Sequence, residues 1–184
     1  MLLASKVAAA ILAVVSAQMS WVNGDSPNAV AYRAQIHEVA EINARVAKPG
    51  LLVSPDVDQL LLASVQFYEA SWNPRAMGDC RGKQCLSGGL MGVHRSLSPW
   101  LRKEVGLPWW KVLRDPESNV LAGYRWLDVR QEQCGGSIEF WLESYRYRKC
   151  PARANELRQG KLRCKFAERL AREVGVEFSC SADS

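Results

Sequence analysis

The sequence predicts a mainly α-helical fold that forms one domain. Apolar residues recur at three- and four-residue spacing through most of the 184-residue chain, and no long stretch alternates apolar and polar residues as a half-buried strand does. Apolar residues make up 48% of the chain, which is enough to bury a core, and neither a linker nor an internal repeat interrupts it. A small β-hairpin between Gly78 and Ser87 is the one non-helical element that we expect.

The first 17 residues have the composition of a signal peptide. Lys6 supplies a positive charge, an apolar run follows from Val7 to Val15, and Ser16-Ala17 provides small residues for cleavage. We therefore expect a signal peptide at residues 1–17 and a single domain at residues 18–184. Two alternatives stay open: an alanine-rich amphipathic helix that belongs to the fold, and a retained signal-anchor. The apolar run is too short for an ordinary membrane span.

Two helices are expected before the middle of the chain. The first begins at Pro27 or Asn28 and ends before Pro49-Gly50. Ser54 can cap the second, because Pro55 suits a first helical turn. Its inward stripe consists of Val57, Leu61, Val65 and Tyr68. Glu69 lies four residues after Val65 and therefore on that stripe.

Three further helices are expected after residue 114. Asp115 can cap one that ends at Gly135-Gly136, and Ser137 can cap the next, whose stripe includes Tyr145. The last is a basic helix after Pro151. Its apolar side carries Leu157, Phe166, Leu170 and Val174, and the cations around it are Arg158, Lys161, Arg163, Lys165, Arg169 and Arg172.

The six cysteines support export, because an even number in a small chain with a secretory-looking start is typical of disulfides. Fifteen pairings are possible, and only Cys80 with Cys85 is favoured, since a short loop closes easily. The two histidines, His37 and His94, show no ligand-like spacing with the cysteines, so we expect no metal and no cofactor.

Glu69 is the candidate catalytic residue. Apolar neighbours and the negative end of the helix macrodipole both favour the protonated form of its carboxyl group. A carboxyl group that keeps its proton near neutral pH can act as a general acid on a glycosidic bond. An ordinary glutamate at a fraying helix end is the alternative.

The residues after Glu69 supply a family resemblance. The string runs Glu69-Ala-Ser-Trp-Asn-Pro-Arg-Ala76, and Ser-Gly-Gly-Leu-Met-Gly follows from Ser87 to Gly92. This combination resembles the SLT-type lytic transglycosylases of the lysozyme-like superfamily, whose pattern is Glu-Ser-x-Phe-Asn-Pro-x-Ala and then Gly-Ala-x-Gly-Leu-Met-Gln. The matching residues are Glu69, Asn73, Pro74, Ala76, Gly89, Leu90 and Met91, and Trp72 stands where the family has an aromatic residue.

Two later segments extend the resemblance to about residue 150. The segment from Asp115 to Gly123 looks like the family's Asn-Ile-x-x-Gly element, and Glu143-Ser144-Tyr145 falls where its Ala-Tyr-Asn element is expected. The sequence departs from the pattern at Gly92 and Arg146, where the family has groove-lining glutamine and asparagine.

The resemblance implies a lysozyme-like, goose-type helical domain that acts on peptidoglycan glycan strands. A lytic transglycosylase cleaves the bond between N-acetylmuramic acid and N-acetylglucosamine and leaves 1,6-anhydromuramoyl ends. Glu69 would be the general acid and base, and Tyr145 would orient it. The implied substrate-binding residues are Ser71, Trp72, Asn73, Gly89, Leu90 and Met91.

Two other functions fit the same residues. A hydrolytic lysozyme would use Asp79, in the loop after the first motif, to activate water or steady the cationic centre. A cell-wall-binding protein that has lost turnover would account for Gly92 and Arg146.

The formal charge of +5 favours polyanionic partners such as the bacterial wall. The basic C-terminal helix is the expected contact, although a solvated helix face needs no partner. Nucleic acid is a poorer candidate, because no stacking aromatics alternate with those cations. We therefore expect an exported protein, periplasmic or extracellular, with the N-terminal segment as an alternative membrane anchor.

Overall fold

The computed structural model describes residues 2–80, 82, 84–147, 149–151 and 157–180, without the side chains of residues 146 and 147. Its longer helices are α1 (Ala4–Ser16), α2 (Pro27–Val46), α3 (Pro55–Ala70), α6 (Pro116–Cys134), α7 (Ile138–Tyr147) and α8 (Arg158–Val174). Its shorter ones are η1 (Ser20–Asn23), η2 (Arg95–Leu97), α4 (Ser98–Trp100), η3 (Leu101–Val105) and α5 (Trp109–Arg114). The strands are β1 (Met77–Gly78), β2 (Ser87–Gly88) and β3 (Val93–His94). The predicted mainly helical fold is confirmed.

The starts of α3 and α6 follow from their capping residues. The hydroxyl of Ser54 accepts a hydrogen bond from the Val57 N–H at 3.3 Å, and the Asp115 carboxylate accepts one from the Ser118 N–H at 3.2 Å. Each cap satisfies a backbone donor that the first helical turn leaves without a partner. Both helices therefore begin where the sequence predicts.

The three strands form a small antiparallel sheet in the order β1-β2-β3. Met77 pairs with Gly88 in the first ladder, and Ser87 pairs with His94 in the second. The first ladder confirms the predicted hairpin. The second adds β3, a strand that the sequence analysis did not expect.

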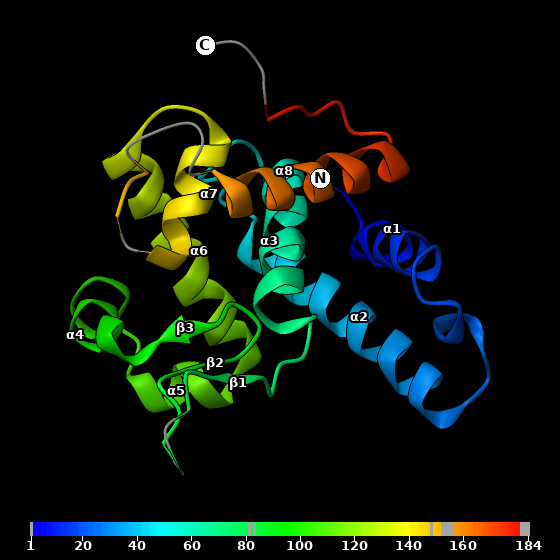
Figure 1. Cartoon of the computed structure of the whole chain (residues 1–184), viewed down its shortest axis with the longest axis horizontal. Helices are drawn as coiled ribbons and strands as arrows, with labels where there is room; N and C mark the ends of the chain where they lie inside the picture. Colours follow the sequence, from blue (N-terminus) through cyan, green and yellow to red (C-terminus); the bar gives the residue numbers. More distant parts are fainter. Residues whose placement is uncertain (1, 81, 83, 148, 152–156, 181–184) are drawn as a thin grey trace.

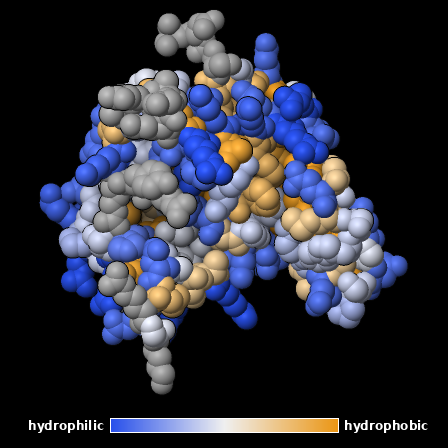
Figure 2. All heavy atoms as spheres, in the orientation of Figure 1, coloured by the Kyte–Doolittle hydropathy of each residue, from blue (hydrophilic) through white to orange (hydrophobic). Residues whose placement is uncertain are grey.

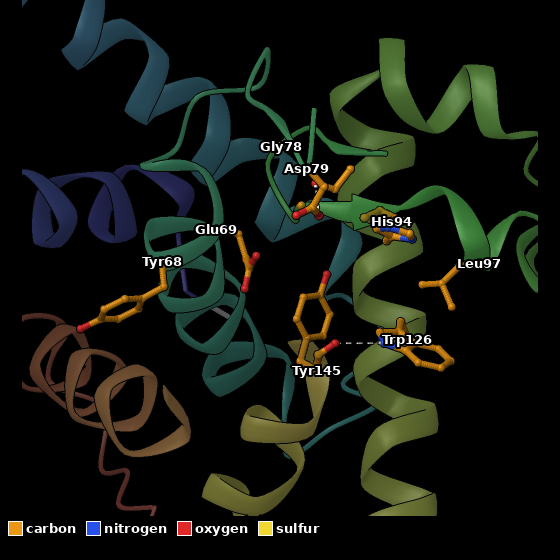
Figure 3. A pocket seen from close by; sticks show the side chains of 11 residues that line it. Tyr68, Glu69, Gly78, Asp79, His94, Leu97, Trp126 and Tyr145 are labelled. Carbon is orange, nitrogen blue, oxygen red and sulfur yellow. Dashed lines mark hydrogen bonds between the residues drawn. The ribbon is translucent and has the colours of Figure 1, made fainter. Parts of the chain in front are cut away.

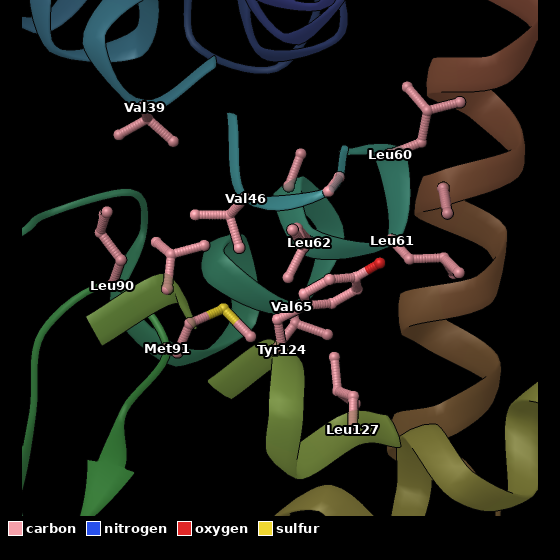
Figure 4. Packing of buried hydrophobic residues seen from close by; sticks show 14 of the residues in the cluster. Val39, Val46, Leu60, Leu61, Leu62, Val65, Leu90, Met91, Tyr124 and Leu127 are labelled. Atoms are coloured by element: carbon pink, nitrogen blue, oxygen red, sulfur yellow. The ribbon is translucent and has the colours of Figure 1, made fainter. Parts of the chain in front are cut away.

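Helix α3 is the central element of the core (Figures 1 and 4). Its residues Leu60, Leu61 and Leu62 have no exposed surface, so the helix is surrounded rather than buried along one stripe. It packs against α1, α2 and α8, and residues of α2, α6 and the segment after β2 complete the cluster in Figure 4. The sheet, α4 and α5 lie together on one side of α3, and α7 and α8 on another (Figure 1).

Helix α1 packs into the same core, against α2 and α8. Val7, Ile11 and Val14 are completely buried, and the backbone N–H of Leu2 donates to Asp56 at 2.6 Å. The signal peptide at residues 1–17 stays a prediction, and so do its two alternatives. Within the described part of the chain, no helix is both long and apolar enough to cross a membrane.

Three disulfides close short loops. Cys80 is bonded to Cys85, as the sequence predicts, with their Cα atoms 3.9 Å apart. The other two pairs are Cys134–Cys150 and Cys164–Cys180, each separated by 16 positions. The second pair ties together the two ends of the segment that carries α7, and the third ties the chain after α8 back to that helix.

Candidate active site

The end of α3 places Glu69 in the last helical turn. The chain leaves the helix through two consecutive residues in the left-handed region, Ser71 with φ 48° and Trp72 with φ 57°. A non-glycine residue in this region costs about 1–2 kcal/mol. The burial of the Trp72 side chain, whose indole N–H donates to the Ala63 carbonyl at 2.9 Å, offsets that strain.

Asn119 of α6 holds the turn that faces Glu69. Its side-chain oxygen accepts from the Met91 N–H at 2.8 Å, and its amide group donates to the carbonyls of Gly88 and Val112 at 2.9 and 3.0 Å. A Cβ on Gly89, which has φ +75°, would lie 2.2 Å from the Asn119 side chain. Glycine is therefore required at position 89 by both contact and conformation.

Gly123 is the glycine that follows Asn119 in the family's Asn-Ile-x-x-Gly element. It lies one turn after Asn119 on the same face of α6. A Cβ there would meet the Met91 side chain at 2.6 Å, so the missing side chain lets Met91 rest directly on the helix. Leu90 and Met91 consequently have no exposed surface and form the floor beneath the site.

Tyr145 of α7 contacts Met91 in that floor. Its hydroxyl donates to the Met91 carbonyl at 2.7 Å, and only 7% of the residue is exposed. Burial raises the pKa of Tyr145 well above its ordinary value; the negative charge of Glu69 raises it further, and the Arg163 cation partly opposes both. Tyr145 is therefore a neutral hydrogen-bonding group throughout the physiological pH range.

Glu69 forms an ion pair with Arg163 of α8. The arginine side chain is 1% exposed and the glutamate side chain 18% exposed. Arg163 was expected among the cations on the surface of α8, and its burial corrects this expectation. Arg163 lies three residues before Phe166 and seven before Leu170, so it shares their inward face.

A cleft of about 270 Å³ opens above Glu69 and Tyr145 (Figure 3). Both side chains point toward it, Asp79 and His94 face it from the sheet, and Trp126 of α6 closes its far side. The described residues that line it are Tyr68, Glu69, Gly78, Asp79, Ser87, Gly92, Val93, His94, Leu97, Trp126 and Tyr145. Within the described residues, no group of histidine, cysteine, aspartate and glutamate side chains gathers closely enough to hold a metal ion.

The two predicted catalytic residues, Glu69 and Tyr145, therefore lie in one cleft. Of the predicted binding residues, Gly89, Leu90 and Met91 support that cleft from below and do not line it. Ser71 and Asn73 are exposed outside its lining, where Asn73 accepts a hydrogen bond from the Arg75 N–H at 2.9 Å.

Trp72 needs a correction. Its indole is completely buried in an aromatic cluster, with ring centroids 4.8 Å from Phe67 and 5.9 Å from Phe166. A ring with no exposed surface cannot stack on a sugar, so we assign Trp72 to the core. Its interior position follows from the left-handed turn, which folds the side chain back under α3.

Trp126 is a tryptophan that does line the cleft. Its ring packs edge-on against Trp100 at 5.3 Å and lies 5.4 Å below the Arg130 guanidinium. Its indole N–H points at the Tyr145 carbonyl, 3.4 Å away. Helical spacing could have found it, because residue 126 follows Asn119 by seven positions and Gly123 by three.

His94 is a second cleft residue that the sequence analysis missed. Its Nδ1 accepts a hydrogen bond from the Ser96 N–H at 3.1 Å, which places the proton of the neutral ring on Nε2. Only its position two residues after Gly92 could have signalled it.

The sequence departs from the family pattern at Gly92 and Arg146. Gly92 lines the cleft, and a Cβ there would lie 2.8 Å from Glu69 Oε2. The side chain of Arg146 lies outside the described part of the structure. The Asp79 carboxylate, invoked for the hydrolytic alternative, also lines the cleft and accepts from the Ser87 hydroxyl at 3.0 Å.

A mainly helical domain with a small antiparallel sheet and a cleft around a helix-terminal glutamate defines a lysozyme-like protein. The family model named Transglycosylase SLT domain matches residues 52–163, which is more than half of the chain. The chain therefore belongs to the SLT transglycosylase family, and this membership implies an enzyme that cleaves peptidoglycan. No match to a curated protein or to a solved structure was found.

Proposed function

We propose that this protein is a peptidoglycan lytic transglycosylase in which Glu69 serves as both general acid and general base. The observation that carries the proposal is the meeting of Glu69 and Tyr145 in one cleft of the SLT domain. The bond cleaved is the β-1,4 bond from N-acetylmuramic acid to N-acetylglucosamine, and the product carries a 1,6-anhydromuramoyl end.

The first step is proton transfer from Glu69 to the oxygen of the glycosidic bond. The bond from that oxygen to the muramoyl C1 breaks, the N-acetylglucosamine end leaves as an alcohol, and positive charge develops at C1. The acetamido group of the substrate can stabilise this charge, so the chemistry needs one protein carboxyl group rather than two.

The second step closes the anhydro ring. The C6 hydroxyl of the same muramoyl unit attacks C1, and its proton passes to the Glu69 carboxylate. Glu69 therefore ends the second step protonated, as it was in the substrate complex before the first step, and no water is consumed.

Tyr145 supports both steps from its fixed place. Because its hydroxyl proton is directed to the Met91 carbonyl, the phenol oxygen remains an acceptor for a substrate hydroxyl. A neutral phenol is the form required, and the raised pKa of Tyr145 maintains it.

A hydrolytic lysozyme is the second candidate, and the position of Asp79 in the cleft lining favours it. In that mechanism the Asp79 carboxylate would activate a water molecule or stabilise the cationic C1, and the products would carry reducing ends. Asp79→Asn would then abolish activity, whereas the transglycosylase retains most of its activity in this variant.

Product analysis tests the proposal. The oxidised full chain should be used, because α1 contributes buried residues to the core. Purified peptidoglycan is incubated with the parent, with Glu69→Gln, and with Glu117→Gln as a control that changes a glutamate outside the cleft lining. Mass spectrometry should show anhydromuropeptides from the parent and the control only. If the parent protein is folded and binds the wall but releases no product, the enzyme proposal is wrong and a wall-binding protein is the remaining interpretation.

Contact with the anionic wall through α8 is part of the proposal. Arg158, Lys161, Lys165 and Arg172 are exposed and share one helical face, and Figure 2 shows hydrophilic side chains along the upper edge of α8 beside hydrophobic ones. Replacing Lys161, Lys165 and Arg172 by serine should weaken sedimentation with purified sacculi at low salt, an effect that added salt removes. The three disulfides fit action outside the cytoplasm.

A further inference from the structure

Arg163 is anchored independently of its contact with Glu69. Its Nη1 donates to the Leu142 carbonyl at 2.6 Å, and its own carbonyl accepts from the Ser64 hydroxyl at 2.5 Å. The guanidinium also lies 5.8 Å from the centre of the Tyr145 ring. The guanidinium is thus held by a backbone carbonyl of α7, and the backbone of residue 163 is held by Ser64 of α3.

The packing of α7 on α8 leaves the arginine little freedom. A Cβ on Gly160 would lie 2.1 Å from the Glu139 carbonyl, so the two helices touch through their backbones there. The buried Glu143 carboxylate accepts from the Gly160 N–H at 2.6 Å and holds this approach. Arg163 follows Gly160 by one helical turn.

Gly92 lies beside the Glu69 side chain as well. Its φ of +55° favours glycine, and a Cβ there would stand 2.8 Å from Glu69 Oε2 and 3.3 Å from Glu69 Cβ. Any side chain at position 92 would therefore push the carboxylate away from its present place. Glycine at 92 and arginine at 163 both constrain where the carboxylate lies.

We infer that Arg163 is a positioning residue that holds Glu69 as a carboxylate in the substrate-free protein and sets its acid strength. The inference rests on the proposed function for its catalytic meaning. A nearby cation stabilises the charged form of a carboxyl group. Arg163 therefore lowers the share of Glu69 that carries a proton, and it stabilises the carboxylate that forms when the proton passes to the glycosidic oxygen.

The protonation state inferred for Glu69 differs from the one that its place in α3 alone predicts. Apolar neighbours and the helix end favour the neutral acid, whereas the buried guanidinium favours the carboxylate. Among the described residues that line the cleft, the other titratable groups are Tyr145 of α7, Tyr68 next to Glu69 in α3, and Asp79 and His94 from the sheet side. Of these cleft residues, Asp79 acts against ionisation of Glu69, and His94 supports ionisation only when protonated.

The direct test measures the protonation of Glu69 in the full chain. Carbon-13 labelling of glutamate side chains allows an NMR titration, and the Glu69 signal is the one missing from Glu69→Gln. The proposal predicts ionisation down to below about pH 4.3, the ordinary glutamate value. A carboxyl group still protonated above that pH would overturn it. This result stands even if the protein releases no product, so it separates the inference from the proposed function.

Two substitutions at position 163 test the link to catalysis. Arg163→Met removes the cation at similar length, and Arg163→Lys keeps the charge. In the methionine variant the alkaline limb of the pH profile for product release should move up by about one pH unit, with a rate about tenfold lower at the parent optimum. The lysine variant should restore the position of that limb.

A purely structural role gives a different result. The rate would then fall equally at every pH and in proportion to the folded fraction, and the limb would not move. A folded Arg163→Met variant with the parent's pH profile overturns the inference. If Arg163→Met does not fold, the comparison of Arg163→Lys with the parent and the NMR titration of the parent still decide it.

Discussion

The side-chain oxygen of Asn119 accepts a hydrogen bond from the Met91 N–H at 2.8 Å, in place of a backbone carbonyl. The two residues are 28 positions apart in the sequence. With its two donated bonds to Gly88 and Val112, this one amide ties the turn before β3 to α6 and to the end of α5. The floor of the cleft therefore depends on a residue that does not line it.

Asn119→Ala should accordingly weaken the protein as well as the site. The substitution leaves buried backbone groups without partners, and we expect a loss of about 3 kcal/mol in the free energy of unfolding. Denaturant unfolding measures this, with Asn73→Ala as the control, since the exposed Asn73 accepts one turn hydrogen bond. A loss at Asn119 no larger than at Asn73 would contradict the account.

Gly89→Ala tests contact and conformation separately. Gly89 and Gly106 have nearly the same φ, +75° and +73°, but a Cβ at position 106 meets nothing within 4 Å. Gly106→Ala should therefore cost about 1 kcal/mol of strain alone. Gly89→Ala should cost at least about 3 kcal/mol, because the methyl group also displaces Asn119. Equal unfolding free energies for the two variants would show that the clash is absorbed.

The two tryptophans beside the motifs should respond in opposite ways. Trp72→Ala removes a completely buried indole and should lower the unfolding free energy by about 3–5 kcal/mol. Trp126→Ala should mainly raise KM for soluble glycan fragments, by about tenfold, because its ring closes the cleft. Comparable KM values in the parent and in Trp126→Ala would remove Trp126 from the binding surface.

Tyr145 should make the fold sensitive to alkali. Its pKa is raised in the folded protein, so its stabilising contribution is complete below about pH 10, where unfolded tyrosine is neutral, and decreases above it. Between the pKa of tyrosine in the unfolded chain and its raised pKa in the folded protein, the free energy of unfolding falls by about 1.4 kcal/mol per pH unit and per tyrosine. The difference in unfolding free energy between the parent and Tyr145→Phe should therefore shrink above about pH 10. A difference that stays constant up to pH 11 would contradict this (about one pH unit beyond the ordinary value).

Helix α1 should contribute to stability in the full chain. Ile11 is completely buried and Leu3 is 65% exposed, so Ile11→Ala should cost about 2–5 kcal/mol and Leu3→Ala well under 1 kcal/mol. N-terminal sequencing of the protein isolated from cells then tells whether residues 1–17 are retained. An Ile11→Ala variant as stable as the parent would mean that α1 is dispensable to the core.

The sequence located the elements whose ends depend on local chemistry. Ser54 with Pro55, and Asp115 with Pro116, mark the starts of α3 and α6 because capping and proline geometry act within one turn. The segment from residue 98 to residue 114 was not predicted. Its helices α4, η3 and α5 are three to six residues long, and helices so short are determined by packing rather than by periodicity.

Within the site, the sequence predicted the residues that motifs mark and missed those that packing brings in. The family pattern predicted Glu69 and Tyr145, which lie in one cleft, and their catalytic roles stay a prediction. Arg163 was missed because its charge suggested solvent, although its helical spacing from Phe166 indicated the interior. Trp72 was misplaced because nothing local indicates that the chain after α3 turns back through two left-handed residues.

If Glu69 catalyses ring closure as proposed, no water enters the product. The most direct measurement is digestion of purified peptidoglycan by the oxidised full chain in water enriched in oxygen-18, followed by mass spectrometry of the released muropeptides. We expect anhydro ends without solvent oxygen from the parent and no release by Glu69→Gln. Reducing ends that carry oxygen-18, or equal release by both proteins, would contradict this expectation.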